Sequence, residues 1–281
     1  MLILSCSSKL QLLENMLRRN LPKTLPVYGA VMHINRGNPA QHEVVVDSWP
    51  EFKVILTRPH MEVVKDHRDK YTNLHAAFYW DIDACQALLE NTEVIDWGRA
   101  FQLQGLQDGL FEVTRGMAET RHVKLKPYFY QAMLHPDPSI YCPSRFKSDL
   151  FHFGTLNSSH AALLNETWSV GGNDWSLHYL DSLIRYFPSA CLLNKEGQLV
   201  SWTVSDPVAC LKHSYTLPQY RGQRCNVAVG LEAAKKMHAK GFPVYGGVLH
   251  ENKSAKRALL ERQGYCILPF TQSILFFTPR C

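Results

Sequence analysis

Long apolar runs, a dominant sign of charge and clustered metal ligands are all missing from this 281-residue sequence. No apolar run approaches the roughly 18–20 residues of a membrane-spanning helix, so no membrane span is expected. Thirty basic residues face 25 acidic ones, and the net charge of +5 is too mild to indicate a nucleic-acid partner. Hydrophobic residues make up 46% of the chain, which is enough for a core in one large domain or two medium ones.

The cysteines give no pattern of metal ligation. All eight are scattered singly, without a CxxC pair or an accompanying group of histidines, so we expect no metal site. An even number of cysteines is compatible with disulfides. Single cysteines spread over a chain of this length are more typical of reduced thiols inside a cell.

Residues 1–25 form a basic amphipathic segment. Apolar side chains recur near helical spacing among four basic residues and a single acid, Glu14 (Leu10, Leu13, Met16, Leu17, Leu21; Lys9, Arg18, Arg19, Lys23). Such a segment is typical of a mitochondrial import signal. It is equally typical of the first packed helix of a domain, and the sequence leaves both interpretations open.

The first half is expected to be rich in strands. We predict a helix at residues 82–90, a tight turn at 35–39, and strands at 27–34, 43–47, 52–56 and 76–79. Pro136, Pro138 and Pro143 concentrate in residues 130–153, and proline at this density disfavours regular structure. We therefore place a linker there, between domains at residues 1–145 and 150–281.

The second half alternates strands and helices. We predict helices at 176–187, 227–240 and 252–263, and strands at 190–193, 199–204, 211–217, 244–249 and 274–277. Three antiparallel strands are thus followed by a polar loop, a helix, a strand, a helix and a last strand. This order predicts a mixed sheet that splays between two of its strands.

The loop at residues 218–226 is the candidate binding site. It leads into a helix N-terminus, where unpaired backbone N–H groups and the helix dipole favour an anion. Arg221 and Arg224 add positive charge, so a pyrophosphate suits this place, with a coenzyme A chain running through the splay. An ordinary strand-to-helix turn has the same pattern, and Asn252 before the next helix has the pattern of a routine N-cap.

The order of elements in the second half resembles the layout of the GNAT acyltransferase superfamily. This order is strand, Arg/Gly loop, helix, strand, Asn252, helix and Gly264-Tyr265. The whole chain resembles, more narrowly, the glycine N-acyltransferase family. Seven segments carry this resemblance, in the family's order: VYGAVMHINRGNP at 27–39, VDSWP at 46–50, YTN at 71–73, FQLQGLQ at 101–107, LLNETW at 163–168, VSW at 200–202 and TLP at 216–218.

The resemblance implies an α/β fold with a GNAT-like mixed, splayed β-sheet flanked by helices, in two packed halves. It implies transfer of an acyl group from acyl-CoA, the co-substrate, to the amino group of glycine or glutamine, by direct attack in a ternary complex. No permanently bound cofactor is expected. Family members are largely mitochondrial, which favours an import signal in residues 1–25, with a cytoplasmic location as the other possibility. We expect a monomer.

The resemblance also assigns residues. Those expected to bind acyl-CoA are Leu217, Arg221, Gly222, Gln223, Arg224, Cys225, Asn226 and Asn252. Gln219 stands where the family has the Glu that serves as general base toward the glycine ammonium. An amide cannot take up a proton at neutral pH, and general-base catalysis is typically worth about 10²–10⁴-fold.

Two interpretations follow from Gln219. In the first, the chain is an active enzyme with another route for the proton. His213 and His250 are the candidate bases because an ordinary histidine pKa suits this role, and removal of the proton by water, with Gln219 only positioning the amine, is the other route. In the second interpretation, which Arg224 also motivates, the chain has lost most of its activity and is a catalytically weak acyl-CoA-binding paralogue.

Further departures from the pattern lie nearby. Arg224 occupies a position where the superfamily has glycine, which is preferred for positive φ or close approach to a phosphate. Asn226 replaces a small residue, and Leu260 replaces the tyrosine that many GNAT enzymes use as general acid. Cys225, beside a helix N-terminus, is expected to have a lowered pKa. Trp202 is expected in the core beside the acyl channel.

The first half is predicted to be a degenerate copy of the same fold. In this interpretation the strand–turn–strand pattern around residues 35–39 corresponds to the strand pair at 191–204.

Overall fold

The computed structural model describes residues 1–139 and 149–280, which form two compact units. Unit 1 comprises Met1–Ala132 and Pro269–Cys281, and unit 2 comprises Met133–Leu268. The linker expected at 130–153 therefore falls partly outside the described residues. The last strand returns to unit 1, so that unit is discontinuous in sequence, unlike the division expected at 145–150.

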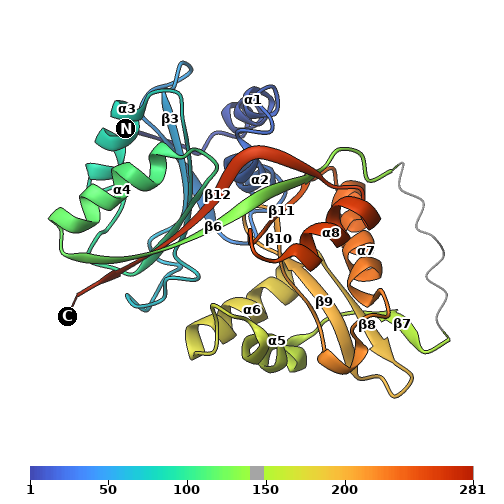
Figure 1. Ribbon diagram of the computed structural model, residues 1–281. Helices are drawn as coiled ribbons and strands as arrows, with labels where there is room; N and C mark the ends of the chain where they lie inside the picture. Colours follow the sequence, from blue (N-terminus) through green and yellow to red (C-terminus); the bar gives the residue numbers. More distant parts are fainter. Residues whose placement is uncertain (140–148, 281) are drawn as a thin grey trace. The chain divides into compact units, whose positions relative to one another are not determined.

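Unit 1 is a mixed sheet with helices (Figure 1). Its elements are β1 (Leu2–Leu4), α1 (Ser7–Arg18), α2 (Leu25–Asn35), β2 (His42–Val46), β3 (Val54–Pro59), β4 (Leu74–Tyr79), α3 (Ile82–Glu90), β5 (Phe101–Gly105), α4 (Gly109–Thr120) and β6 (Val123–His135). The strand order is β1-β2-β3-β4-β5-β12-β6, so the C-terminal strand β12 (Cys266–Pro279) lies between β5 and β6. β4 and β5 are parallel, whereas β12 is antiparallel to β5.

Unit 2 has the same kinds of element. They are β7 (Phe151–Gly154), η1 (Ser158–His160), α5 (Ala161–Thr167), α6 (Asp174–Tyr186), β8 (Ser189–Asn194), β9 (Leu199–Ser205), β10 (Cys210–Thr216), η2 (Pro218–Tyr220), α7 (Cys225–Ala239), β11 (Val244–Val248) and α8 (Lys253–Arg262), followed by β12. The strand order here is β6-β11-β10-β9-β8-β7. Only the β10–β11 pair among these five later strands is parallel.

The two units repeat one order of elements. Each runs strand, helices, three strands, helix, strand, helix, strand, from β1 to β6 and from β7 to β12. The repeat expected from the sequence is therefore present, although the correspondence proposed around residues 35–39 is wrong. β2, β3 and β4, rather than that turn, hold the places of β8, β9 and β10.

Residues 27–34 are helical, and the predicted strand there is wrong. This run is apolar on all sides because nearly every residue of α2 is buried, and an all-apolar run carries no periodicity that separates helix from strand. α2 packs against α1 and against β2, β3 and β4. The predicted helix at 82–90 is confirmed as α3, and the helices and strands predicted in the second half are confirmed with shifted ends.

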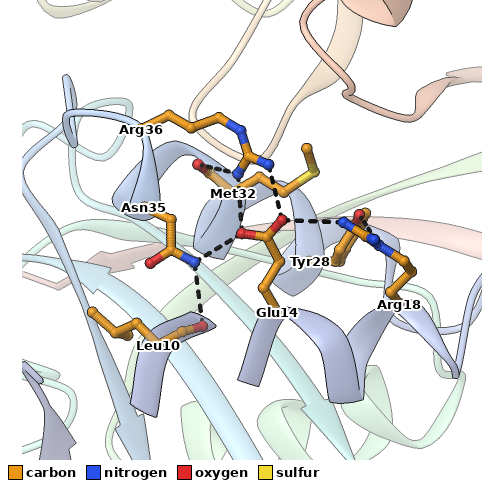
Figure 2. Close-up of polar contacts among 7 residues, drawn as sticks. All are labelled: Leu10, Glu14, Arg18, Tyr28, Met32, Asn35 and Arg36. Atoms are coloured by element: carbon orange, nitrogen blue, oxygen red, sulfur yellow. Dashed lines mark hydrogen bonds and ion pairs between the residues drawn. The ribbon is translucent and has the colours of Figure 1, made fainter. Parts of the chain in front are cut away.

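The N-terminal segment is part of unit 1. β1 pairs with β2, and Leu13 and Leu17 of α1 are fully buried. The Glu14 carboxylate, itself buried, accepts hydrogen bonds from Arg36 and Asn35 at the end of α2 (Figure 2). The predicted turn at residues 35–39 therefore lies at the end of a helix, in the connection from α2 to β2, and not between two strands of a hairpin.

Candidate active site

The sheet of unit 2 opens between β10 and β11. The two strands pair only at Cys210–Tyr245 and Leu211–Gly246, although β10 continues to Thr216 and β11 to Val248. Gly246 lies at the last pair, where a Cβ atom would stand 2.7 Å from the Leu211 carbonyl oxygen. The strands therefore approach closely at one end and separate beyond it, as the sequence predicted.

A bulge in β10 lies at the start of this opening. The register with β9 shifts between Lys212 and Tyr215, and His213 has a left-handed φ of 50°. Its Nε2 lies 2.7 Å from the Leu164 carbonyl oxygen, which can only accept, so Nε2 carries the hydrogen. Burial lowers the pKa of His213 to about 4, against the weaker opposing effect of this hydrogen bond. His213 is therefore neutral at pH 7 and is a weak base.

The open edge of β10 ends in the loop that was predicted to bind phosphate. Leu217 N–H donates to the Val200 carbonyl on β9 at 3.0 Å. The Thr216 carbonyl belongs to the same trans peptide and points the opposite way, toward the edge of β10 that faces β11. Arg221 Nε donates to this carbonyl at 3.1 Å, and its guanidinium lies 5.4 Å from the centre of the Tyr215 ring. The exposed Arg221 side chain thus lies along the open edge.

The short helix η2 is anchored by one residue. Tyr220 accepts a hydrogen bond from Asn194 Nδ2 at 3.3 Å and packs edge-on against Phe151 at 5.7 Å. Gln219, next to it, is exposed. The anchored turn therefore presents to solvent Gln219, the residue that the resemblance places at the general-base position.

The N-terminus of α7 has no side-chain cap. Its first backbone N–H groups, from Cys225 onward, precede the first helical hydrogen bond, which Ala228 N–H donates to Arg224. Arg224 is exposed and adopts the left-handed conformation, with φ 61°, that the glycine of the superfamily pattern would adopt without strain. Gly222 is also left-handed, with φ 80° and open space around it, and Gln223 is exposed.

Cys225 differs from expectation. The thiol is buried, and burial raises its pKa, so the predicted lowering is wrong. The helix dipole favours a thiolate, but desolvation of the side chain under α7 is the larger effect. Asn226, half-buried, accepts a hydrogen bond from the buried Gln263 at 3.3 Å, which ties α7 to the end of α8.

His250 and Asn252 lie in the connection between β11 and α8, and both are exposed. Asn252 is the N-cap of α8, and its Oδ1 accepts from Ala255 N–H at 3.0 Å. That bond is the routine N-cap considered for this position. Leu260 is half-buried on α8.

An aromatic group lies on the face of β9 and β10 that does not pack on α7. Trp202 is fully buried, and its ring centre lies 5.2 Å from that of Tyr215 and 6.0 Å from that of His213. Trp168, at the end of α5, lies 5.7 Å from His213. Sequence reasoning singled out Trp202 but missed Trp168 and Tyr215, although LLNETW and the strand alternation of residues 202 and 215 were available as signals.

Metal-ligand clusters and membrane-spanning helices are both absent from the described residues. Within residues 1–139 and 149–280, no group of His, Cys, Asp and Glu is placed to hold a metal ion. Among the helices of the same ranges, none combines the length and apolar character that crossing a bilayer requires.

The fold is that of the GNAT acyltransferases. A Drosophila protein solved by a structural genomics consortium superimposes with a TM-score of 0.80 at 17% identity, over 100% of this chain and 99% of the other. A tandem GNAT protein from the clavulanic acid biosynthesis pathway gives a TM-score of 0.52 at 11% identity, over 99% and 97%. A GCN5-related N-acetyltransferase from Kribbella flavida gives 0.55 at 12% identity, over 90% and 96%.

The family is narrower than the fold. A family model described as aralkyl acyl-CoA:amino acid N-acyltransferase matches residues 1–188, and the model of its C-terminal region matches residues 190–272. The chain therefore belongs to this family of acyltransferases. It is 35% identical to glycine N-acyltransferase of Bos taurus over 269 residues, covering 90% of this chain and 91% of the relative. It is 36% identical to the glycine N-acyltransferase-like protein Keg1 of Mus musculus, over 96% and 97%, and 33% identical to glycine N-phenylacetyltransferase of Bos taurus, over 88% and 90%.

Proposed function

We propose that this protein transfers an acyl group from acyl-CoA to the amino group of glycine or glutamine, by direct attack in a ternary complex. The observation that carries the proposal is the uncapped N-terminus of α7, which lies beside the opening between β10 and β11 in a member of an acyl-CoA:amino acid N-acyltransferase family. Helix N–H groups without a side-chain partner suit an anion of the pyrophosphate kind.

The acyl-CoA would be held by the loop and the helix start. The backbone N–H groups of Cys225 and Asn226 and the exposed Arg224 offer donors and charge to the phosphates, and Arg221 lies along the same edge. Gly222 leaves open space at the loop surface. Leu217 and Gln223 complete the loop, and Asn252 would serve by starting α8 beyond β11.

The aromatic face suits an aralkyl acyl group. Tyr215 and Trp168, both partly exposed, offer apolar ring surface next to the bulge of β10, and the fully buried Trp202 packs beside Tyr215. A relative is named for phenylacetyl transfer, and we propose a donor of this class for the present chain. An aromatic acyl group packed against these rings would be stabilised by the burial of apolar area and by the interaction of the ring quadrupoles.

The acceptor ammonium must lose a proton before its nitrogen attacks the thioester. Gln219 cannot act as a base, and the lowered pKa of His213, about 4, leaves it poorly suited to take a proton from an ammonium group. His250 is exposed at the end of β11, and it remains a candidate base. Without a base, attack depends on the small neutral fraction of the amine, with Gln219 orienting it. The alternative proposal, a weakly catalytic acyl-CoA-binding paralogue, rests on this same residue.

Product formation by the purified protein tests the proposal. We expect incubation with glycine and phenylacetyl-CoA to yield acylglycine and free CoA in equal amounts, measured by mass spectrometry because protein thiols would interfere with thiol reagents. Binding of CoA without acylglycine formation, with glycine or with glutamine, would favour the binding paralogue. Absence of both would overturn the assignment.

The cellular setting is proposed on the resemblance alone. We propose a mitochondrial, monomeric enzyme that forms acylglycines in detoxification. Its segment 1–25 is packed into unit 1 through β1 and α1, so an import signal there would have to act before folding. Fractionation of cells that express the tagged chain, with and without residues 1–25, measures this directly.

A further inference from the structure

We infer that the chain binds one acyl-CoA, in unit 2, because side chains close the corresponding place in unit 1. The inference rests on the proposed function, since it takes the opening between β10 and β11 as the acyl-CoA site. The repeat of elements makes β4, α3 and β5 the counterparts of β10, α7 and β11. Unit 1 could therefore offer a second site of the same kind.

The first closure is at the sheet. β4 and β5 are parallel and pair from Leu74–Gln102 to Ala76–Gln104, after which β4 continues to Tyr79. There the side-chain amide of Gln107 takes both backbone groups of Tyr79: Tyr79 N–H donates to Oε1 at 2.9 Å, and Nε2 donates to the Tyr79 carbonyl at 2.7 Å. The Gln107 side chain thus stands where a further residue of β5 would pair, and it holds the strands together beyond their third and last pair.

The second closure is at the helix. Asp81 is the N-cap of α3, and its Oδ1 accepts from Asp83 N–H at 3.0 Å and from Ala84 N–H at 3.2 Å. A carboxylate therefore already occupies the donors that would hold a phosphate, and Asp83 in the first turn adds negative charge beside them. Hydrogen bonds from the Ala84 and Asp83 amides and from Lys53 lower the pKa of Asp81, so it stays charged.

The loop that precedes the helix also leaves less room for a ligand in unit 1 than in unit 2. Residues 80–81 alone join β4 to α3, whereas residues 217–224, with Arg221, Gly222 and Arg224, join β10 to α7. In unit 2, no side chain caps α7. Among the hydrogen bonds of the described residues, no side chain bonds both the N–H and the C=O of one β10 residue at the opening, as Gln107 does for Tyr79 in unit 1. One fold thus carries an open site in one repeat and a closed one in the other.

Stoichiometry and position test the inference. Titration of the wild-type protein with CoA in a calorimeter is expected to give one site per chain, and the double variant Arg221→Glu/Arg224→Glu is expected to lose all binding. Backbone amide signals of Cys225 and Asn226 are expected to shift with CoA, while those of Asp83 and Ala84 stay in place. Two sites in the wild type, residual binding in the double variant, or shifts at Ala84 would overturn the inference.

Amide hydrogen exchange keeps the inference separate from the proposed function. In wild type we expect slow exchange at Tyr79 and Ala84, about tenfold faster exchange at Tyr79 in Gln107→Ala, and about tenfold faster exchange at Ala84 in Asp81→Ala, as the loss of one hydrogen bond implies. Gln86→Ala, an exposed change in the same helix, is the matched control. No CoA binding anywhere with these exchange rates would refute the proposed function only, whereas fast exchange at Tyr79 and Ala84 in wild type would refute the closure.

Discussion

Replacing Glu14 by glutamine should destabilise unit 1 measurably. The Glu14 side chain is 9% exposed, and it accepts from Arg36 Nη2 at 2.9 Å, Arg36 Nη1 at 3.0 Å and Asn35 Nδ2 at 2.8 Å (Figure 2). Arg18 lies at 3.4 Å, at the limit of a hydrogen bond. An amide of the same size keeps one acceptor but turns an NH₂ group toward donors, and it removes the negative charge that faces two arginines.

The magnitude follows from exposure. Removing one member of a fully buried pair costs about 3–5 kcal/mol. The side chains of Arg36 and Arg18 are 38% and 56% exposed, so water can solvate them once the carboxylate is gone. We therefore expect the free energy of unfolding to fall by about 2 kcal/mol, toward the lower end of charge-assisted hydrogen bonds.

Urea unfolding followed by circular dichroism measures this change. The exposed Glu62→Gln should alter the free energy of unfolding by less than about 0.5 kcal/mol and serves as the control. Burial raises the pKa of Glu14, but the hydrogen bonds from Arg36 and Asn35 together lower it by more than burial raises it. The folded-state pKa therefore lies below the ordinary 4.5. The stabilisation is thus present above that pH and is lost as pH falls through the folded-state pKa. A loss below about 0.5 kcal/mol at pH 7 would refute the reasoning.

Three other outcomes are expected. Burial, followed by neighbouring charges, lowers the pKa of His42 to about 3 and that of His75 to about 4. Because these histidines take up protons at higher pH in the unfolded chain, the free energy of unfolding should fall by about 2 kcal/mol per histidine between pH 6.5 and pH 5. A urea midpoint that stays constant over this pH range would contradict this prediction. Arg224→Gly should raise the melting temperature, since about 1 kcal/mol of left-handed strain is relieved, while weakening CoA binding; a lower melting temperature would show that the strain is absent. Deleting residues 269–280 removes the strand between β5 and β6, with its fully buried Leu275, and should abolish cooperative unfolding of unit 1 by circular dichroism; a retained transition would contradict the strand assignment.

The sequence predicted unit 2 better than unit 1. Apolar and polar residues alternate along its strands and helices with the period of each element, so the elements could be recognised. The Arg/Gly loop marks the start of α7 and Asn252 marks the start of α8. The opening of the sheet could therefore be predicted from the order of the elements. In unit 1 the run at 27–34 is buried on all sides, which removes the periodicity that identifies a helix. Pairing partners 22 or more residues apart, such as Glu14 with Arg36 or Gln107 with Tyr79, leave no local signal at all.

The sequence indicated a candidate site at the start of α7 but could not indicate the pKa values of the side chains around it. The loop composition indicated an anion site, yet it could not show that Cys225 is buried beneath α7 or that His213 is held by the Leu164 carbonyl. Both pKa directions depend on desolvation, which requires the packed structure. The left-handed backbone at Arg224 was suggested only by the family's glycine at that position.

The pH dependence of acylglycine formation by wild type and Gln219→Glu tests the central claim most directly. With glycine and phenylacetyl-CoA from about pH 6.5 to about pH 9.5, wild type should form acylglycine at a rate that rises with pH, because only the neutral amine attacks. Gln219→Glu should be faster near neutral pH, by about 10²-fold if the carboxylate acts as a base, and its rate should depend less on pH. Absence of acylglycine from both proteins at every pH would contradict the account.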